Sequence, residues 1–172
     1  MRALLNRIVL RVTSILFIAV LATPGPVVQA QPTPRKTTSE SARDLSMGTW
    51  VMNREKSKYR PGPAPLSITR TYEPHADGVK VTIETVTERG KSVVEFVAEY
   101  DSMEYPVKGS PDIDALSLKA VDLYTAEIIL RHAGRDIGFA RRVISRDGQT
   151  MTMTFSSGTT RNVTVYEKQP SP

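Results

Sequence analysis

The chain has 172 residues, of which 40% are hydrophobic and 24% charged, and its formal net charge is +5. This length fits a single domain, because two domains would each have to be unusually small. The absence of cysteine excludes a disulfide scaffold, a thiolate zinc site and a cysteine nucleophile. Twelve prolines and ten glycines favour frequent turns over long helices.

Residues 1–30 have the pattern of a secretory signal peptide. Three arginines flank or precede an almost wholly apolar run at 12–22, and Val28 and Ala30 are small residues at the positions that a signal peptidase requires. The apolar run is too short to cross a bilayer, which takes ~20 residues. No arginine pair precedes it, so we expect export by the general secretory route to the periplasm or the extracellular medium.

Removal of this segment changes the charge balance. Three of the 23 basic residues lie in 1–30, so 20 basic residues face 18 acidic ones in the mature chain, a net charge of +2. This balance does not indicate a nucleic-acid partner. The polar, proline-bearing stretch 31–44 predicts a disordered leader, and 169–172 a frayed tail. The folded domain is therefore expected at 45–168, as a monomer with no membrane insertion after signal cleavage.

Inside 45–168, apolar and polar residues alternate, and turn signals recur every 8–12 residues. This pattern is typical of an all-β sandwich or barrel. The proline-rich stretch 61–65 forbids a helix in the only gap wide enough for one. We expect about ten antiparallel strands, near residues 47–53, 67–73, 79–87, 92–101, 103–108, 115–121, 125–131, 136–145, 149–156 and 161–168.

Consecutive hairpins without crossover helices predict an up-and-down meander. Ten such strands leave two long edges unless the sheet closes, so a closed or nearly closed barrel follows. A barrel of eight or more strands can enclose a ligand. Charged residues on the outward faces, such as Lys80, Glu84 and Glu95, exclude the apolar outer band of a transmembrane barrel.

The two ends of this domain carry a resemblance to known proteins. The first strand opens with Gly48-Thr49-Trp50, and the last closes with Val165-Tyr166-Glu167-Lys168. With ten meander strands, these motifs resemble the fatty-acid-binding-protein branch of the calycin superfamily, and the opening is also similar to the lipocalin signature. With the segments at 55–57 and 61–63, the chain most resembles uncharacterised exported bacterial lipocalin-like proteins.

The resemblance implies recognition of a ligand and no catalysis. Fatty-acid-binding proteins hold a carboxylate with an Arg-x-Tyr pair on the last strand and a second arginine on an earlier strand. Tyr166 matches the tyrosine, whereas Thr164 stands where the first arginine would be. The second arginine falls at Arg141, within one or two residues. The loop 61–65 replaces the helical lid of that family, so the barrel mouth is either open or plugged by this loop.

These inferences predict a protein that binds a small apolar or amphipathic molecule non-covalently inside a calycin-like barrel. Arg141 and Tyr166 are its expected polar anchors, although Arg141 could instead form a surface salt bridge and Tyr166 could satisfy a buried carbonyl. Gly48 and Trp50 are expected to have structural roles, with Trp50 packed across one barrel end. The expected apolar contacts are Phe96, Leu118, Ile128, Met153 and Phe155.

Catalytic and metal-binding patterns are missing from the sequence. His75 and His132 lie in polar turns without converging ligands, and no nucleophile, zinc or phosphate-loop motif occurs. We therefore expect no cofactor and no enzyme activity. The alternative function is a ligand-free interaction or envelope module that docks through an edge strand or the proline loop. A hydrolase or isomerase on the same fold is a third alternative, which no motif supports.

Overall fold

The computed structural model describes residues 44–76 and 78–170. The expected signal peptide and all of the expected leader except Asp44 lie outside the described residues, as do residues 171 and 172. In the described part no helix is long and apolar enough to cross a membrane. It forms ten strands: β1 (Gly48–Arg60), β2 (Ser67–His75), β3 (Gly78–Thr87), β4 (Gly90–Ala98), β5 (Asp101–Lys108), β6 (Ala115–Ala120), β7 (Thr125–His132), β8 (Arg135–Ile144), β9 (Thr150–Ser157) and β10 (Thr160–Lys168).

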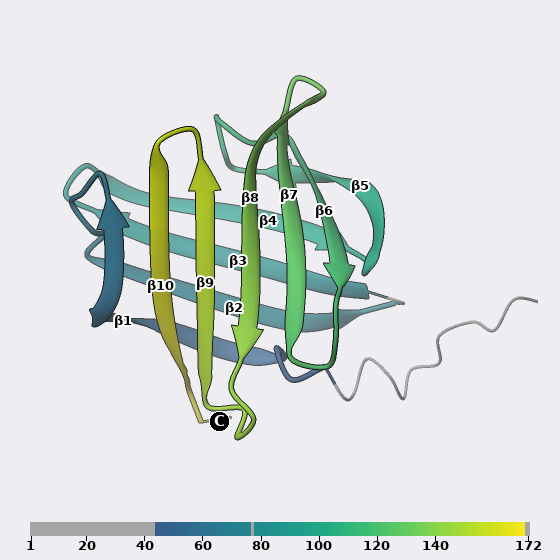
Figure 1. The fold of residues 1–172 in the computed structure, drawn as a ribbon, viewed down its shortest axis with the longest axis horizontal. Coiled ribbons are helices and arrows are strands. Elements are labelled where there is room, and N and C mark those ends of the chain that lie inside the picture. The colour runs from purple at the N-terminus through teal and green to yellow at the C-terminus, as the bar shows by residue number, and fades with distance from the viewer. Residues whose placement is uncertain (1–43, 77, 171–172) are drawn as a thin grey trace, which may run out of the picture. The chain divides into compact units, whose positions relative to one another are not determined.

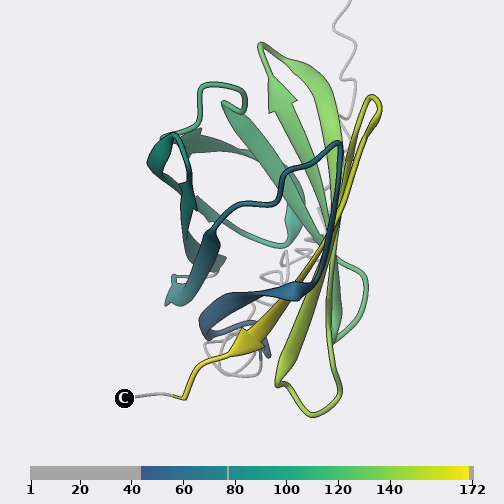
Figure 2. The ribbon, with the colours of Figure 1, turned by 90° about the vertical axis from the view of Figure 1, so that its left-hand side faces the viewer.

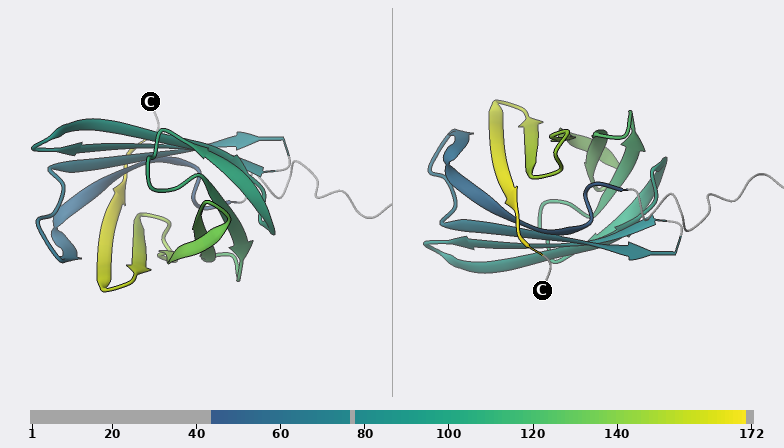
Figure 3. Two further views of the ribbon diagram at one scale, coloured as in Figure 1. Left: turned by 90° about the horizontal axis from the view of Figure 1, so that it is seen from above. Right: turned by 90° about the horizontal axis from the view of Figure 1, so that it is seen from below.

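The strands form a closed antiparallel barrel in which each pairs with the next along the chain (Figure 1). Pairing of β1 with both β2 and β10 closes the ring. The expected all-β, ten-stranded up-and-down barrel is therefore confirmed. Strands β7 to β10 cross β2 to β4 steeply, so the barrel has two facing layers, which the end views also show (Figure 3).

Successive side chains of each strand alternate between the interior and the outer surface of the barrel, as β3 shows. Val79 and Val81 are fully buried, whereas Lys80 between them pairs with Glu73 across the outer surface at 3.5 Å. Neighbouring strands also approach closely where β5 leaves β4. A side chain at Gly109, whose φ is +81°, would place its Cβ 2.0 Å from the carbonyl oxygen of Val93. Glycine is therefore required at this position.

The first strand differs from its prediction, because it extends to Arg60 and does not end near residue 53. The pairing of β1 with β10 shifts register between Asn53 and Lys58. The Ser57 hydroxyl donates to the Asn53 carbonyl at 2.7 Å and accepts from the Val165 amide at 3.0 Å. A side chain thus replaces a backbone partner in the ladder, and β1 bends at this bulge to stand beside β10 (Figure 1).

One end of the barrel is tightly packed. Trp50 at the start of β1, Val79 at the start of β3 and Met151 at the start of β9 are all completely buried there. The Trp50 ring donates its Nε1 hydrogen to the Ser46 carbonyl at 2.7 Å, which ties the segment before β1 across this end. We call this region the packed end, and its closure leaves the remaining interior for a cavity.

Candidate functional site

The barrel contains a cavity of about 250 Å³, lined mainly by apolar side chains. The lining residues come from both layers of the barrel, whose ribbons face each other in Figure 2. Small-molecule sites usually have ~300–1,000 Å³, so this cavity lies just below that range and suits a small ligand. The interior is therefore not completely filled by side chains. The proline-rich loop 61–65 contributes none of the cavity-lining residues.

Six of the seven predicted ligand contacts lie on the cavity wall. The apolar ones come from β4, β6, β7 and β9, and the sixth, Tyr166, comes from β10. Their place in the sequence determines this arrangement, since every second residue of a strand faces inward. The six residues are Phe96, Leu118, Ile128, Met153, Phe155 and Tyr166.

The seventh predicted contact, Arg141, does not face the cavity, and its assignment as an inward polar anchor is wrong. Its side chain is 46% exposed on the outer surface and pairs with Glu127 of β7 at 3.5 Å. Phe139 and Val143, on the same face, are also about 40% exposed. The next residue, Arg142, is buried and lines the cavity.

The error has a steric cause. The inner face of β8 carries the small residues Gly138 and Ala140 in its first half, whereas the bulky apolar residues Phe139 and Val143 face outward. A Cβ on Gly138 would lie 3.1 Å from the ring of Phe155, which occupies that part of the interior. Hydrophobic alternation alone therefore selected the wrong face of β8, because the inward positions are small where β9 supplies the bulk.

Sequence reasoning also missed Arg70, which lines the cavity from β2. Its Nε–H donates to the Tyr166 hydroxyl at 3.0 Å, and its guanidinium carbon lies 5.4 Å from the centre of that ring. The sequence contains the signal, because Arg70 lies two residues after Ile68 and two residues before Tyr72, which are both buried. Residues at this spacing share one face of a strand, so Arg70 is expected to point inward as well.

Arg70 is half-buried, and its side chain lines the cavity. Burial opposes its charge, but the phenols of Tyr166 and Tyr72 favour it, and the pKa of Arg70 stays above its ordinary value. None of the ion pairs found among residues 44–76 and 78–170 includes Arg70. The described barrel therefore presents a permanent positive charge to an apolar cavity without a carboxylate to offset it.

The position where fatty-acid-binding proteins have a last-strand arginine is occupied by Thr164. This residue is buried, lines the cavity and hydrogen-bonds through its hydroxyl to Tyr59 at 2.8 Å. Burial raises the pKa of Tyr59 above its ordinary value, so this phenol stays protonated. A neutral pair thus occupies this part of the wall, and the arginines that line the cavity come from β2 and β8.

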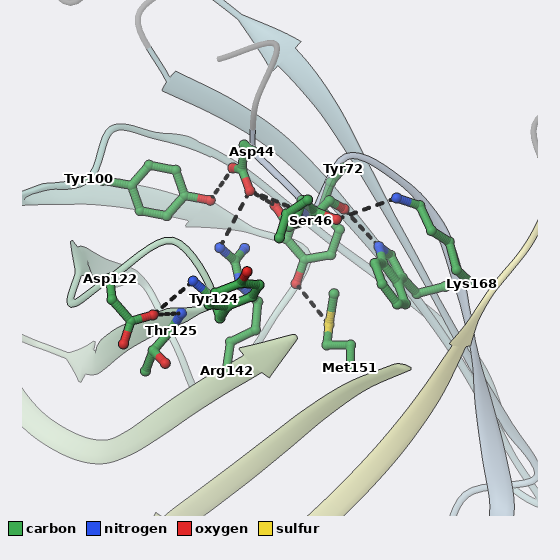
Figure 4. Close-up of polar contacts among 12 residues, drawn as sticks. Asp44, Ser46, Tyr72, Tyr100, Asp122, Tyr124, Thr125, Arg142, Met151 and Lys168 are labelled. Atoms are coloured by element: carbon green, nitrogen blue, oxygen red, sulfur yellow. Dashed lines mark hydrogen bonds and ion pairs between the residues drawn. The ribbon is translucent and has the colours of Figure 1, made fainter. Parts of the chain in front are cut away.

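Polar contacts also cross the packed end, where Asp44 joins the barrel (Figure 4). Its carboxylate accepts hydrogen bonds from the Ser46 amide and hydroxyl and from the Tyr100 hydroxyl, at 2.7–2.9 Å. Arg142 lies 3.7 Å from the same carboxylate. The sequence pattern places Asp44 in the disordered leader, but its contacts attach it to the folded domain.

No group of three His, Cys, Asp or Glu residues in the described part could hold a metal ion.

Comparisons with known proteins agree with this architecture. No family model matches the chain. No curated protein matches it by sequence. Among solved structures, a REP1-NXSQ fatty acid transporter superposes with a TM-score of 0.52 at 11% identity, covering 73% of this chain and 97% of that one. A point mutant of the fluorescent protein UnaG superposes with a TM-score of 0.51 at 15% identity, covering 74% and 99%.

Identities this low establish a common fold and nothing finer. The matches cover almost the whole of both solved structures, and this chain forms a closed meander of ten antiparallel strands. The chain therefore has a calycin-type barrel fold, of the kind found in the fatty acid transporter and in UnaG.

Proposed function

We propose that the barrel binds a small amphipathic molecule non-covalently, with an apolar body in the cavity and an anionic group at Arg70. The observation that carries this proposal is Arg70 itself, a half-buried cation that lines an apolar cavity and has no carboxylate partner among the described residues. A neutral apolar ligand would use the same walls but would leave this charge without a partner.

The energetic argument starts from the cost of Arg70. A charge removed from water is costly unless another charge and hydrogen bonds compensate for it. The Tyr166 hydroxyl accepts one hydrogen bond from the guanidinium. A carboxylate or sulfonate of a ligand would supply the opposite charge, and such charge-assisted hydrogen bonds are stronger than neutral ones.

The apolar part of the ligand would gain free energy by burial against the cavity walls, at ~25 cal/mol per Å² removed from water. Met153 has a flexible side chain and Phe155 a planar ring, and both suit contact with an alkyl chain or a ring of the ligand. One of the structurally similar proteins is a fatty acid transporter, which is consistent with a ligand that has an acyl chain. Binding, and no chemical conversion, is the proposed activity.

The test uses the protein processed and purified from an exporting bacterial host and then freed of lipid. Displacement of the fluorescent probe 1-anilinonaphthalene-8-sulfonate would compare decanoate with 1-decanol, which has the same chain and no charge. A hydrogen bond to a charged group contributes ~1.5–3 kcal/mol, so decanoate should bind at least about tenfold more tightly. The Arg70→Gln variant should lose this advantage.

The matched control is Arg141→Gln, which removes the same charge from the outer surface and should leave both affinities unchanged. Equal affinity for decanoate and 1-decanol in the parent protein would show that no anion is recognised. Failure to bind the probe or either compound would instead favour the interaction module, to be tested by capture of partners through the loop 61–65.

Export by the general secretory route is part of the same proposal and is supported by residues 1–30. N-terminal sequencing of the purified protein provides its test. A mature chain that begins at Gln31 supports the proposal, and an intact N-terminus in the cytoplasm contradicts it.

A further inference from the structure

A second arginine of the described residues, Arg142, also lines the cavity. Its guanidinium carbon lies 5.4 Å from the ring centre of Tyr72 and 5.5 Å from that of Tyr100. Its Nε atom is buried without a hydrogen-bond partner in the described part of the chain. Unlike Arg70, it has an acidic neighbour, since its Nη2 lies 3.7 Å from a carboxylate oxygen of Asp44.

Asp44 is held in place by donors other than this arginine. The Ser46 amide and hydroxyl donate to one of its oxygens at 2.9 and 2.7 Å, and the Tyr100 hydroxyl donates to the other at 2.7 Å. Burial raises the pKa of Tyr100 to about 12, so its hydroxyl remains a donor at neutral pH. The distance to Arg142 is longer than a hydrogen bond. Asp44 therefore acts on Arg142 chiefly through its charge.

Both arginines lie beside Tyr72. The Arg142 guanidinium faces its ring, and Arg70 lies two residues before Tyr72 on the same face of β2, where both line the cavity. Two positive charges thus flank one aromatic side chain at the cavity wall. Among the described residues, Asp44 is the only acid paired with either of them. The group of Arg70, Arg142 and Asp44 consequently carries a net charge of +1, and it would carry +2 without Asp44.

We propose that Asp44 determines the charge of the ligand, so that the cavity accepts amphipathic molecules with one negative charge and rejects those with two. This inference rests on the proposed function. A singly charged head group would balance the group of three residues. A second negative charge would be buried near these three residues without a cation left to balance it, which is costly in a low-dielectric interior. Such rejection by an uncompensated charge is a common basis of specificity.

The experiment compares decyl sulfate with decyl phosphate, at concentrations well below micelle formation. Both have the same chain and a tetrahedral head group, but at about pH 8 the sulfate has one charge and the phosphate close to two, since its second pKa is about 6. Displacement of 1-anilinonaphthalene-8-sulfonate would measure both affinities. The parent protein should bind decyl sulfate at least about tenfold more tightly, and Asp44→Asn should move the affinity ratio about tenfold or more toward the phosphate.

Two variants separate this effect from a structural one. Asp101→Asn is a matched control, because Asp101 also accepts hydrogen bonds from a backbone amide and a tyrosine hydroxyl but is exposed. It should leave the ratio unchanged. The double variant Asp44→Asn/Arg142→Met removes both charges and should restore the preference for decyl sulfate. Circular dichroism would verify folding, and Asp44→Ser replaces Asp44→Asn if the latter does not fold.

The outcomes distinguish this inference from the function on which it rests. A parent protein that binds neither compound contradicts the proposed function and the inference with it. A parent protein that binds both compounds equally well contradicts only the role of Asp44, and this conclusion needs no variant. An Asp44→Asn protein that weakens or strengthens both compounds to the same extent also contradicts that role.

Discussion

Both Arg70 and Arg142 line the cavity, but their surroundings differ, since Arg142 lies where the cavity meets the packed end. At the packed end, Arg142 lies near the Asp44 carboxylate and two tyrosine rings. In the cavity, Arg70 has a tyrosine hydroxyl and no acid among the described residues. The charge of Arg142 is therefore largely balanced within the protein, whereas the charge of Arg70 has no acidic partner among the described residues. We therefore expect the packed end to contribute chiefly to stability, and Arg70 to contribute chiefly to the proposed ligand binding.

The largest expected effect concerns the packed end. Trp50→Ala would remove a completely buried ring and the hydrogen bond to the Ser46 carbonyl. Such truncations lower the free energy of unfolding by about 3–5 kcal/mol, which urea denaturation would measure. Leu123→Ala is the control, since Leu123 is 58% exposed and its truncation should cost little. A loss below about 1 kcal/mol for Trp50→Ala would contradict the stabilising role of this end.

An intermediate effect is expected from pH, through Tyr100. Burial raises its pKa from 10.0 to about 12. Below pH 10 the phenol is protonated in the folded and unfolded chains, and its contribution to stability is fully present. Between pH 10 and about 12 the unfolded chain loses the proton first, so stability falls by about 2–3 kcal/mol.

The measurement is the free energy of unfolding from pH 9 to 12 in the parent protein and in Tyr100→Phe. The difference between the two proteins isolates Tyr100 from the other titrating groups. The parent should lose the additional stability within this interval. Parallel pH profiles would mean that the hydroxyl is not buried against Asp44 at the packed end.

The smallest expected effect compares the two arginines directly. Arg70→Met should raise the free energy of unfolding of the ligand-free protein by about 1 kcal/mol, because it removes a desolvated charge with no acidic partner. Arg142→Met should lower it by a similar amount, since the Asp44 carboxylate loses its neighbouring cation. Thermal unfolding of both variants would measure the signs. A change of the same sign in the free energy of unfolding of both variants would contradict this distinction between the two arginines.

The fold was accessible from the sequence because hairpins are local. Glycine-containing turns and alternation in segments such as 79–84 predict strands without knowledge of distant residues. The extension of β1 was not predictable in this way, since its second half is held by Ser57 and by pairing with β10 more than 100 residues later. Only the closed barrel brings those residues together.

The cavity walls were partly predictable for the same reason. Strict alternation placed Phe96 and Ile128 on the inner face, where the structure has them. It failed on β8, where Phe155 of β9 fills the space in front of small inward residues. Whether such residues bind a ligand remains a prediction, which the binding experiments address.

The sequence by itself determined the strands, their antiparallel order and the closure of the barrel, because these follow from local turns and from the need to pair strand edges. Only the tertiary structure decided which of the two adjacent arginines on β8 faces inward and which inward arginine has an acidic partner. That outcome depends on Asp44, Arg142 and Arg70, which are distant in the chain and meet only when the barrel closes. Charge balance inside a protein is a property of three-dimensional neighbours, and alternation along a strand does not reveal it.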